Sequence, residues 1–213
     1  ISYTVDGYGE GLAYLLILYI TYLFLKNEDG YLKYFLIGFF SFIVIGIRPN
    51  YIVFCTILIF SYILYLSLQK KKFQKNNLKI FYLILGYSFI LLIPTHNYIY
   101  GNEIVLLVKS ENVQNSYHVR LSDYLLLLKT FLQFEVNFEL LQKILNHLTH
   151  YIKFYEFWFL IVLLNLVIVL FTNHQIKLKI LSLSLLFMHS TFLLFLGDPR
   201  YSMGTWLISF IIF

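Results

Sequence analysis

The sequence predicts an all-α protein, built as a polytopic bundle of transmembrane helices. Three observations support this prediction. Hydrophobic residues make up 60% of the 213 residues, the mean hydropathy is +0.75, and long apolar stretches recur with short polar connections between them. A soluble domain needs less apolar sequence to fill one core. Lipid is therefore the expected environment of most of the chain.

About seven stretches are apolar enough to be membrane spans. A span needs roughly 20 mostly apolar residues, or fewer where flanking side chains reach the interface or the bilayer thins. The expected spans are residues 7–25, 34–47, 51–68, 80–94, 157–171, 180–197 and 201–213. Only Arg48-Pro49-Asn50 separates the second span from the third, so these two are expected to form a tight helical hairpin.

Both ends of the sequence fall inside this pattern. The chain begins at Ile1 rather than at a methionine and stops at Phe213 within an apolar stretch. We therefore expect residues 1–213 to be a partial transmembrane domain of one larger membrane protein.

Lysines are concentrated in alternate loops, and this predicts the orientation. Basic residues beside spans are retained in the cytoplasm, whereas acidic residues matter little. Arg48 and Arg200 are the only basic residues of the short turns on the opposite side. The lysine-rich loops should be cytoplasmic, which puts residues 95–156 outside. The lysines of the three inner loops are Lys26, Lys33, Lys70, Lys71, Lys72, Lys75, Lys79, Lys177 and Lys179.

The loop of residues 95–156 is too long to be a simple connection, because loops of this size usually have a function or a structure of their own. Residues 121–134 and 136–152 space their apolar side chains at helical intervals, with Ser122 as a possible cap. They predict two amphipathic helices on the outer membrane surface. The loop's five basic and six acidic residues nearly cancel, which argues against nucleic acid as a partner.

Arg48 and Arg200 are the basic residues most informative about function. Each lies beside a proline at an outer helix end, where a guanidinium can bind a phosphate with paired donors. The alternative is that each arginine only caps its helix or reaches the interface. Glu10, at the outer mouth of the first span, could act as a base or hold a cation.

Other polar residues carry weaker signals. His147 and His150 are three residues apart, but no third ligand is spaced with them, so we expect a solvated helix face and no metal site. His189 and Asn165 lie inside apolar spans and are expected to form hydrogen bonds between helices. Cys55 is the single cysteine, so no disulfide can form within the chain.

Four stretches together resemble the polytopic GT-C glycosyltransferases, the superfamily of protein mannosyltransferases and lipid A aminoarabinose transferases. Residues 9–12 (GEGL) look like the family's acidic residue at an outer helix end. Residues 35–50 are similar to its "LLxGLxxGLxxLxRPN" hairpin. Residues 94–102 resemble its "P…RNYxxFGN" motif, with His96 in place of arginine. Residues 198–201 (DPRY) resemble its "RYxxP" element, with Gly204 where proline is expected.

This resemblance implies transfer of a sugar from a polyprenyl-phosphate donor to a lipid, glycan or protein acceptor on the extracytoplasmic face. It implies Glu10 as a catalytic residue, and a divalent cation as a possible cofactor of an inverting displacement. The implied location is the bacterial inner (plasma) membrane, as a multi-pass protein. The family's principal catalytic acid would lie upstream of Ile1. The implied substrate-binding residues are Arg48, Arg200, Tyr201 and Asn97.

Two other functions fit the same features. An O-antigen polymerase or ligase also has many spans, a large outer loop and outer arginines. A transporter or lipid flippase is the non-enzymatic alternative, but such proteins usually have charged residues at mid-depth. The expected spans have no Asp, Glu, Lys or Arg in their middle, and this counts against transport.

Overall fold

The computed structural model describes residues 8–27, 30–69, 73–102, 104, 119, 121–133, 135–196 and 203–211. Within these residues the regular structure is entirely helical and no strand occurs, in agreement with the predicted fold class. The α-helices are α1 (Tyr8–Leu25), α2 (Tyr31–Ile47), α3 (Ile52–Leu68), α4 (Phe73–Tyr87), α5 (Leu92–Gly101), α6 (Leu121–Leu132), α7 (Phe138–Phe171), α8 (Ile176–Thr191) and α9 (Met203–Ile211). Shorter turns are the 3₁₀ segments η1 (Pro49–Tyr51) and η3 (Ser88–Leu91) and the π-helical η4 (Phe192–Leu196).

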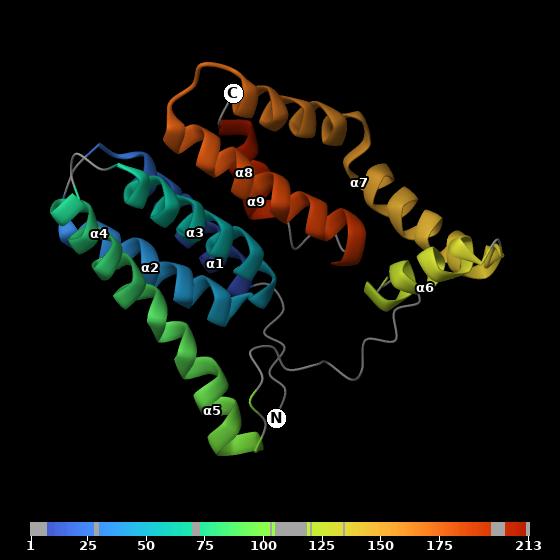
Figure 1. Ribbon diagram of the computed structural model, residues 1–213, viewed down its shortest axis with the longest axis horizontal. Coiled ribbons are helices and arrows are strands. Elements are labelled where there is room, and N and C mark those ends of the chain that lie inside the picture. The colour runs from blue at the N-terminus through green and yellow to red at the C-terminus, as the bar shows by residue number, and fades with distance from the viewer. Residues whose placement is uncertain are drawn as a thin grey trace.

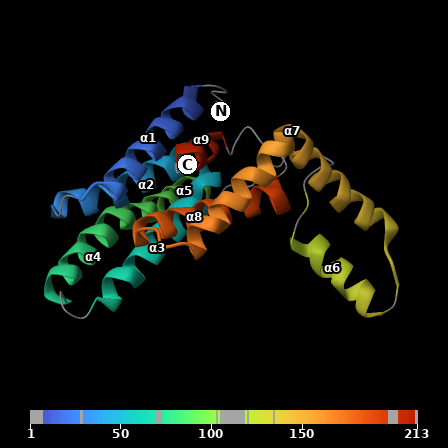
Figure 2. The same cartoon turned by 90° about the horizontal axis from the view of Figure 1, so that it is seen from above.

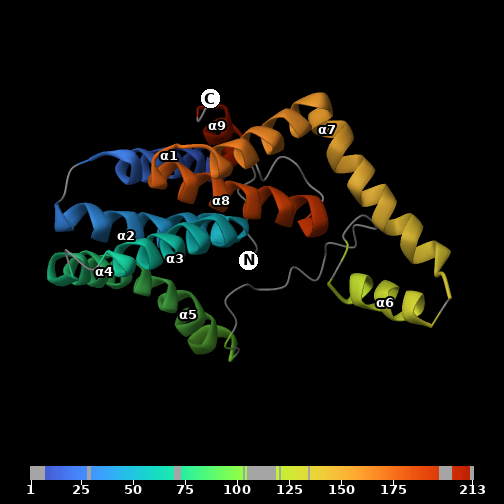
Figure 3. The same ribbon diagram turned by 45° about the horizontal axis from the view of Figure 1, so that its top comes forward.

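The centre of the molecule is a bundle of α1, α2, α3, α4 and α8, with α9 packed on α1 (Figure 1). Its core is continuous and apolar; the largest fully buried side chains in it include Phe24, Tyr34, Tyr51, Phe54 and Phe192. The predicted hairpin is present, because α2 ends at Ile47 and the single turn η1 reverses the chain into α3 (Figure 3). Pro49 opens this turn, where its missing N–H costs nothing.

Two glycines allow α2 and α4 to pack backbone against backbone. A Cβ atom added to Gly38 would lie 2.3 Å from the Leu83 carbonyl oxygen, and one added to Gly86 would lie 2.2 Å from the Phe35 carbonyl oxygen. No side chain fits at either position. Close crossings of this kind are typical of helices that pack in lipid, where small residues let backbones approach.

Helix α4 continues through η3 into α5, and this longer helical run replaces the predicted span 80–94. Gln74–Gly101 is helical throughout, so Pro94 does not end the helix as expected but lies in the first turn of α5, where proline is tolerated. Proline still removes one backbone hydrogen bond, and the run changes direction near η3, so that α5 projects from the bundle (Figure 3).

The outer-loop helices differ from the prediction in two respects. Helix α6 begins at Leu121, so Ser122 lies inside its first turn and is not a cap. Residues 136–152 and 157–171 were expected as separate elements, but they form the single helix α7, since no glycine or proline interrupts residues 138–171. The cap is Asn137, whose Oδ1 accepts a hydrogen bond from the Leu140 N–H at 3.0 Å.

Helix α6 and the first half of α7 form a hairpin beside the bundle, which we call the outer hairpin (Figure 2). Its small core contains the buried residues Val119, Leu140 and Ile144. Asp123 and Lys143 join the two helices by an ion pair of 2.7 Å.

The outer hairpin reaches the bundle through Tyr124. Its hydroxyl donates a hydrogen bond of 2.7 Å to the Leu194 carbonyl of η4, and its ring meets Phe195 edge to face. Burial raises the pKa of the Tyr124 phenol, and the charge of Asp123 adds to this effect, so the hydroxyl keeps the proton that it donates. This contact fixes α6 to the end of α8.

The three lysine-rich loops lie at one end of the bundle, as the alternation of charge predicted. The Lys177 ammonium at the start of α8 donates to the Leu25 and Lys26 carbonyls at the end of α1, at 3.3 and 3.0 Å. Lys33 and Lys79 both lie over the ring of Tyr34, which ties the α1–α2 connection to the start of α4. The Lys177 ammonium therefore lies at the C-terminal end of α1, where positive charge is favourable.

Three helical runs of the described chain are long and apolar enough to cross a membrane. They are Pro49–Leu68, Gln74–Gly101 and Ile176–Phe195. Glu10–Leu25, Tyr31–Ile47 and Leu160–Phe171 are apolar but shorter. The seventh predicted span, 201–213, lies partly outside the described residues, which include only Met203–Ile211 of it.

Candidate functional site

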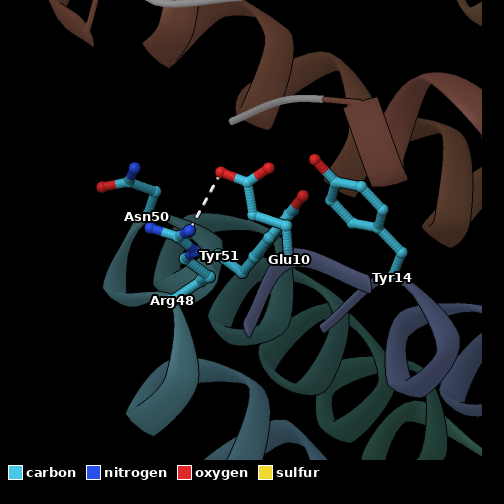
Figure 4. Close-up of a pocket in the computed structure, with 5 residues that line it drawn as sticks. All are labelled: Glu10, Tyr14, Arg48, Asn50 and Tyr51. Atoms are coloured by element: carbon cyan, nitrogen blue, oxygen red, sulfur yellow. Dashed lines mark hydrogen bonds and ion pairs between the residues drawn. The ribbon is translucent and has the colours of Figure 1, made fainter. Parts of the chain in front are cut away.

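The first turn of α1 and the end of α2 bring Glu10 and Arg48 together. Arg48 ends α2 in an extended conformation because Pro49 follows it. Its Nη2 atom lies 2.9 Å from Oε1 of Glu10, so the two side chains form a hydrogen-bonded ion pair across 38 residues of sequence (Figure 4). Their side chains are 21% and 28% exposed, so the pair is neither buried nor fully solvated.

The ion pair lines an open hollow of about 170 Å³. Tyr14, one turn after Glu10, and Asn50 and Tyr51 from η1 complete its wall (Figure 4). This volume includes open solvent, and the hollow encloses no space as large as a water molecule. It is therefore a shallow depression, in which a ligand's phosphate would contact Arg48 from the open side.

Helix α9 packs against two of the residues that line the hollow. A Cβ atom on Gly204 would lie 2.7 Å from Cδ1 of Tyr14 and 3.0 Å from the hydroxyl of Tyr51. Glycine at this position lets the first turn of α9 approach both rings. The family motif has proline at this position. In this chain the residue is glycine, because the close approach of Tyr14 and Tyr51 leaves little room for a side chain.

A buried polar contact holds α9 against α8. His189 Nε2 lies 3.1 Å from the Ser209 hydroxyl, which itself donates to the Thr205 carbonyl at 2.8 Å. Since the serine has one hydrogen, the histidine donates through Nε2. The ring of His189 also meets Trp206 edge to face. The prediction that His189 forms a hydrogen bond between helices is confirmed.

The other predicted residues lie elsewhere in the fold or outside the described residues. Asn97 lies on α5, which projects from the bundle, and it does not line the hollow. Arg200 and Tyr201 lie outside the described residues. Asn165 is half-buried in α7, and Cys55 is buried in the bundle core.

The interpretation of His147 was wrong. His147 is fully buried, whereas His150 is exposed. The reason is helical spacing, because His147 follows Leu140 by seven residues and Ile144 by three, and so shares the apolar face of the outer hairpin.

The described residues include no group of three or more His, Cys, Asp or Glu side chains that could hold a metal ion. Glu10 is the single acidic residue among the five that line the hollow. A divalent cation there would have one protein carboxylate and would depend on oxygens from its substrate.

Sequence reasoning missed Tyr14, Asn50 and Tyr51. Tyr14 was recognisable in principle, because it lies four residues after Glu10 and so shares its helix face. Asn50 was quoted only as part of a motif. Nothing in the sequence distinguishes Tyr51 from the other 18 tyrosines of this aromatic-rich chain.

No family model, curated protein or solved structure matches this chain. The resemblance to the GT-C glycosyltransferases therefore stays a prediction made from the motifs alone.

Proposed function

We propose that the chain is part of a multi-pass membrane glycosyltransferase that uses a polyprenyl-phosphate sugar as donor on the extracytoplasmic face. The single observation that carries this proposal is the Glu10–Arg48 ion pair at the mouth of an open hollow. It joins an oxyanion-binding guanidinium and a carboxylate, which are the two groups that the reaction requires.

Each group has a role in this reaction. The acceptor hydroxyl attacks the anomeric carbon of the donor sugar, the bond from that carbon to the phosphate oxygen breaks, and polyprenyl phosphate leaves with the electron pair. Glu10 takes the proton of the hydroxyl. Arg48 stabilises the negative charge that grows on the leaving phosphate.

Arg200 is proposed as the second phosphate ligand. It precedes Gly204 by four residues, and four residues of extended chain span at most about 14 Å. Gly204 packs against Tyr14 and Tyr51, so Arg200 is close in sequence to a residue beside the hollow, and this supports the proposal. Tyr201 and Asn97 remain proposed substrate-binding residues from the family motifs alone.

The proposed setting is a membrane crossed about seven times, with the lysine-rich loops in the cytoplasm and residues 95–156 outside. The three long apolar runs support membrane insertion, and the shared end of the lysine loops supports one common side for them. A polyprenyl tail gains about 0.8 kcal/mol per buried CH₂ group, so the donor stays in the bilayer and the enzyme must meet it there.

Cysteine labelling of intact cells tests this orientation. In a Cys55→Ser background, a cysteine at Gln74 should react with an impermeant maleimide only after permeabilisation, and a cysteine at Asn115 should react without it. The reverse pattern would place the hollow on the cytoplasmic side and rule out an extracytoplasmic reaction.

Arginine-to-lysine exchanges in the full-length protein test the site. Transfer of labelled sugar from polyprenyl-phosphate donors of the host membrane should fall about tenfold or more in Arg48→Lys and Arg200→Lys, because lysine cannot replace a paired, charge-assisted contact. Arg120→Lys, at the remaining arginine of the sequence, is the matched control and should keep normal transfer. If all three variants keep full activity at equal abundance, the proposed phosphate site is ruled out.

A further inference from the structure

Among the described residues, Arg48 is the one basic residue that lines the hollow, and Glu10 is the one acidic residue. Their contact joins one guanidinium nitrogen to one carboxylate oxygen, at 2.9 Å. Carboxylate and phosphate oxygens bind a guanidinium with the same geometry and the same sign of charge. Glu10 therefore occupies the position on Arg48 that a phosphate oxygen would take.

Glu10 and a phosphate compete for the same guanidinium. Because Oε1 of Glu10 lies 2.9 Å from Nη2 of Arg48, a phosphate bound to Arg48 would lie close to the Glu10 carboxylate. The positive charge of Arg48 would then be shared by two anions, and like charges at this range repel. An exchange of partners removes that repulsion, while a joint complex retains it.

We infer that Glu10 and the donor's phosphate are alternative partners of Arg48, so that binding of the donor itself releases the Glu10 carboxylate. The inference rests on the proposed function and assigns a control step to the same site. Before the donor binds, Oε1 of Glu10 is held by Arg48. After the exchange both carboxylate oxygens are free to turn to the acceptor hydroxyl, so binding of the donor prepares the base.

The test measures binding of farnesyl phosphate, a short polyprenyl phosphate, to the full-length protein in detergent by calorimetry. Glu10→Gln keeps the shape of the side chain but removes the competing charge. It should bind farnesyl phosphate about two- to fivefold more tightly than the wild type, the factor that corresponds to a partly exposed ion pair, and its sugar transfer should fall. In an Arg48→Gln background, the Glu10→Gln substitution should change the affinity for farnesyl phosphate by less than the experimental error.

Two controls accompany this comparison. Asp123→Asn removes a carboxylate from an ion pair far from the hollow in sequence, with Lys143 at 2.7 Å, and should leave the affinity unchanged. A parallel titration with inorganic phosphate identifies the source of the anion: tightening by Glu10→Gln with either ligand supports the exchange, and tightening with farnesyl phosphate alone assigns the site to a lipid-linked donor.

The outcomes separate this inference from the proposed function. If Glu10→Gln binds farnesyl phosphate as tightly as the wild type or more weakly, the proposed exchange of partners is overturned. The phosphate site itself would survive this result if Arg48→Gln lowers the affinity for farnesyl phosphate. If the wild type binds neither ligand, or if Arg48→Gln binds as tightly as the wild type, the proposed function fails and the exchange fails with it.

Discussion

The bundle and the outer hairpin are both helical, but they are held together by different interactions. In the bundle, α2 and α4 touch backbone to backbone at Gly38 and Gly86, and a continuous apolar core joins the other helices. The outer hairpin has a small core around Val119, Leu140 and Ile144, one ion pair, and the Tyr124 contact to η4. The bundle is therefore the more densely packed region, and we expect the lightly packed hairpin to open at a lower free-energy cost.

The largest expected effect is at the glycine crossing. Gly38→Ala places a methyl group 2.3 Å from a backbone oxygen, so the helices must separate, at a cost of about 3 kcal/mol of unfolding free energy. Gly46→Ala in the same helix is the matched control, because no atom lies within 4 Å of its added Cβ, and it should be neutral or slightly stabilising. Thermal melting of the full-length protein in detergent measures both. Equal melting temperatures would mean that the crossing is not close.

A smaller effect is expected at the cap of the outer hairpin. Asn137→Ala removes the bond from the Leu140 N–H and should cost about 1 kcal/mol of local stability. Faster hydrogen exchange should appear in residues 121–152, with the bundle melting temperature unchanged. Asn146→Ala, at an exposed position of the same helix, serves as the control. If Asn137→Ala lowers the melting of the bundle as well, the two regions unfold as one unit and the contrast between them is lost.

The sequence predicted the helical fold, the Arg48-Pro49-Asn50 hairpin and the common end of the lysine loops, because these depend on local features: apolar length, a proline and repeated charge. Helix limits were less predictable. Pro94 was expected to stop a helix, yet it lies in a first turn, and whether a proline ends a run depends on packing around it. The burial of His147 likewise depends on α6, which lies elsewhere in the chain.

The site followed the same rule. Glu10 and Arg48 were each selected from their own neighbourhoods, and their ion pair could only be seen once α1 and α2 were placed side by side. The contribution of Gly204 depends on α1 and η1, which are far from it in sequence. The chemistry of single residues could be predicted from the sequence, whereas the spatial relations between distant segments could not.

The contact of Gly204 with Tyr14 and Tyr51 has a consequence for biosynthesis. Glu10, Arg48 and Tyr51 leave the ribosome before α9, which follows Tyr51 by more than 150 residues. At usual elongation rates that interval is on the order of 10 to 30 s. During this time Tyr14 and Tyr51 lack their contact with α9, so a chain interrupted before α9 can insert its preceding helices and still lack a finished site.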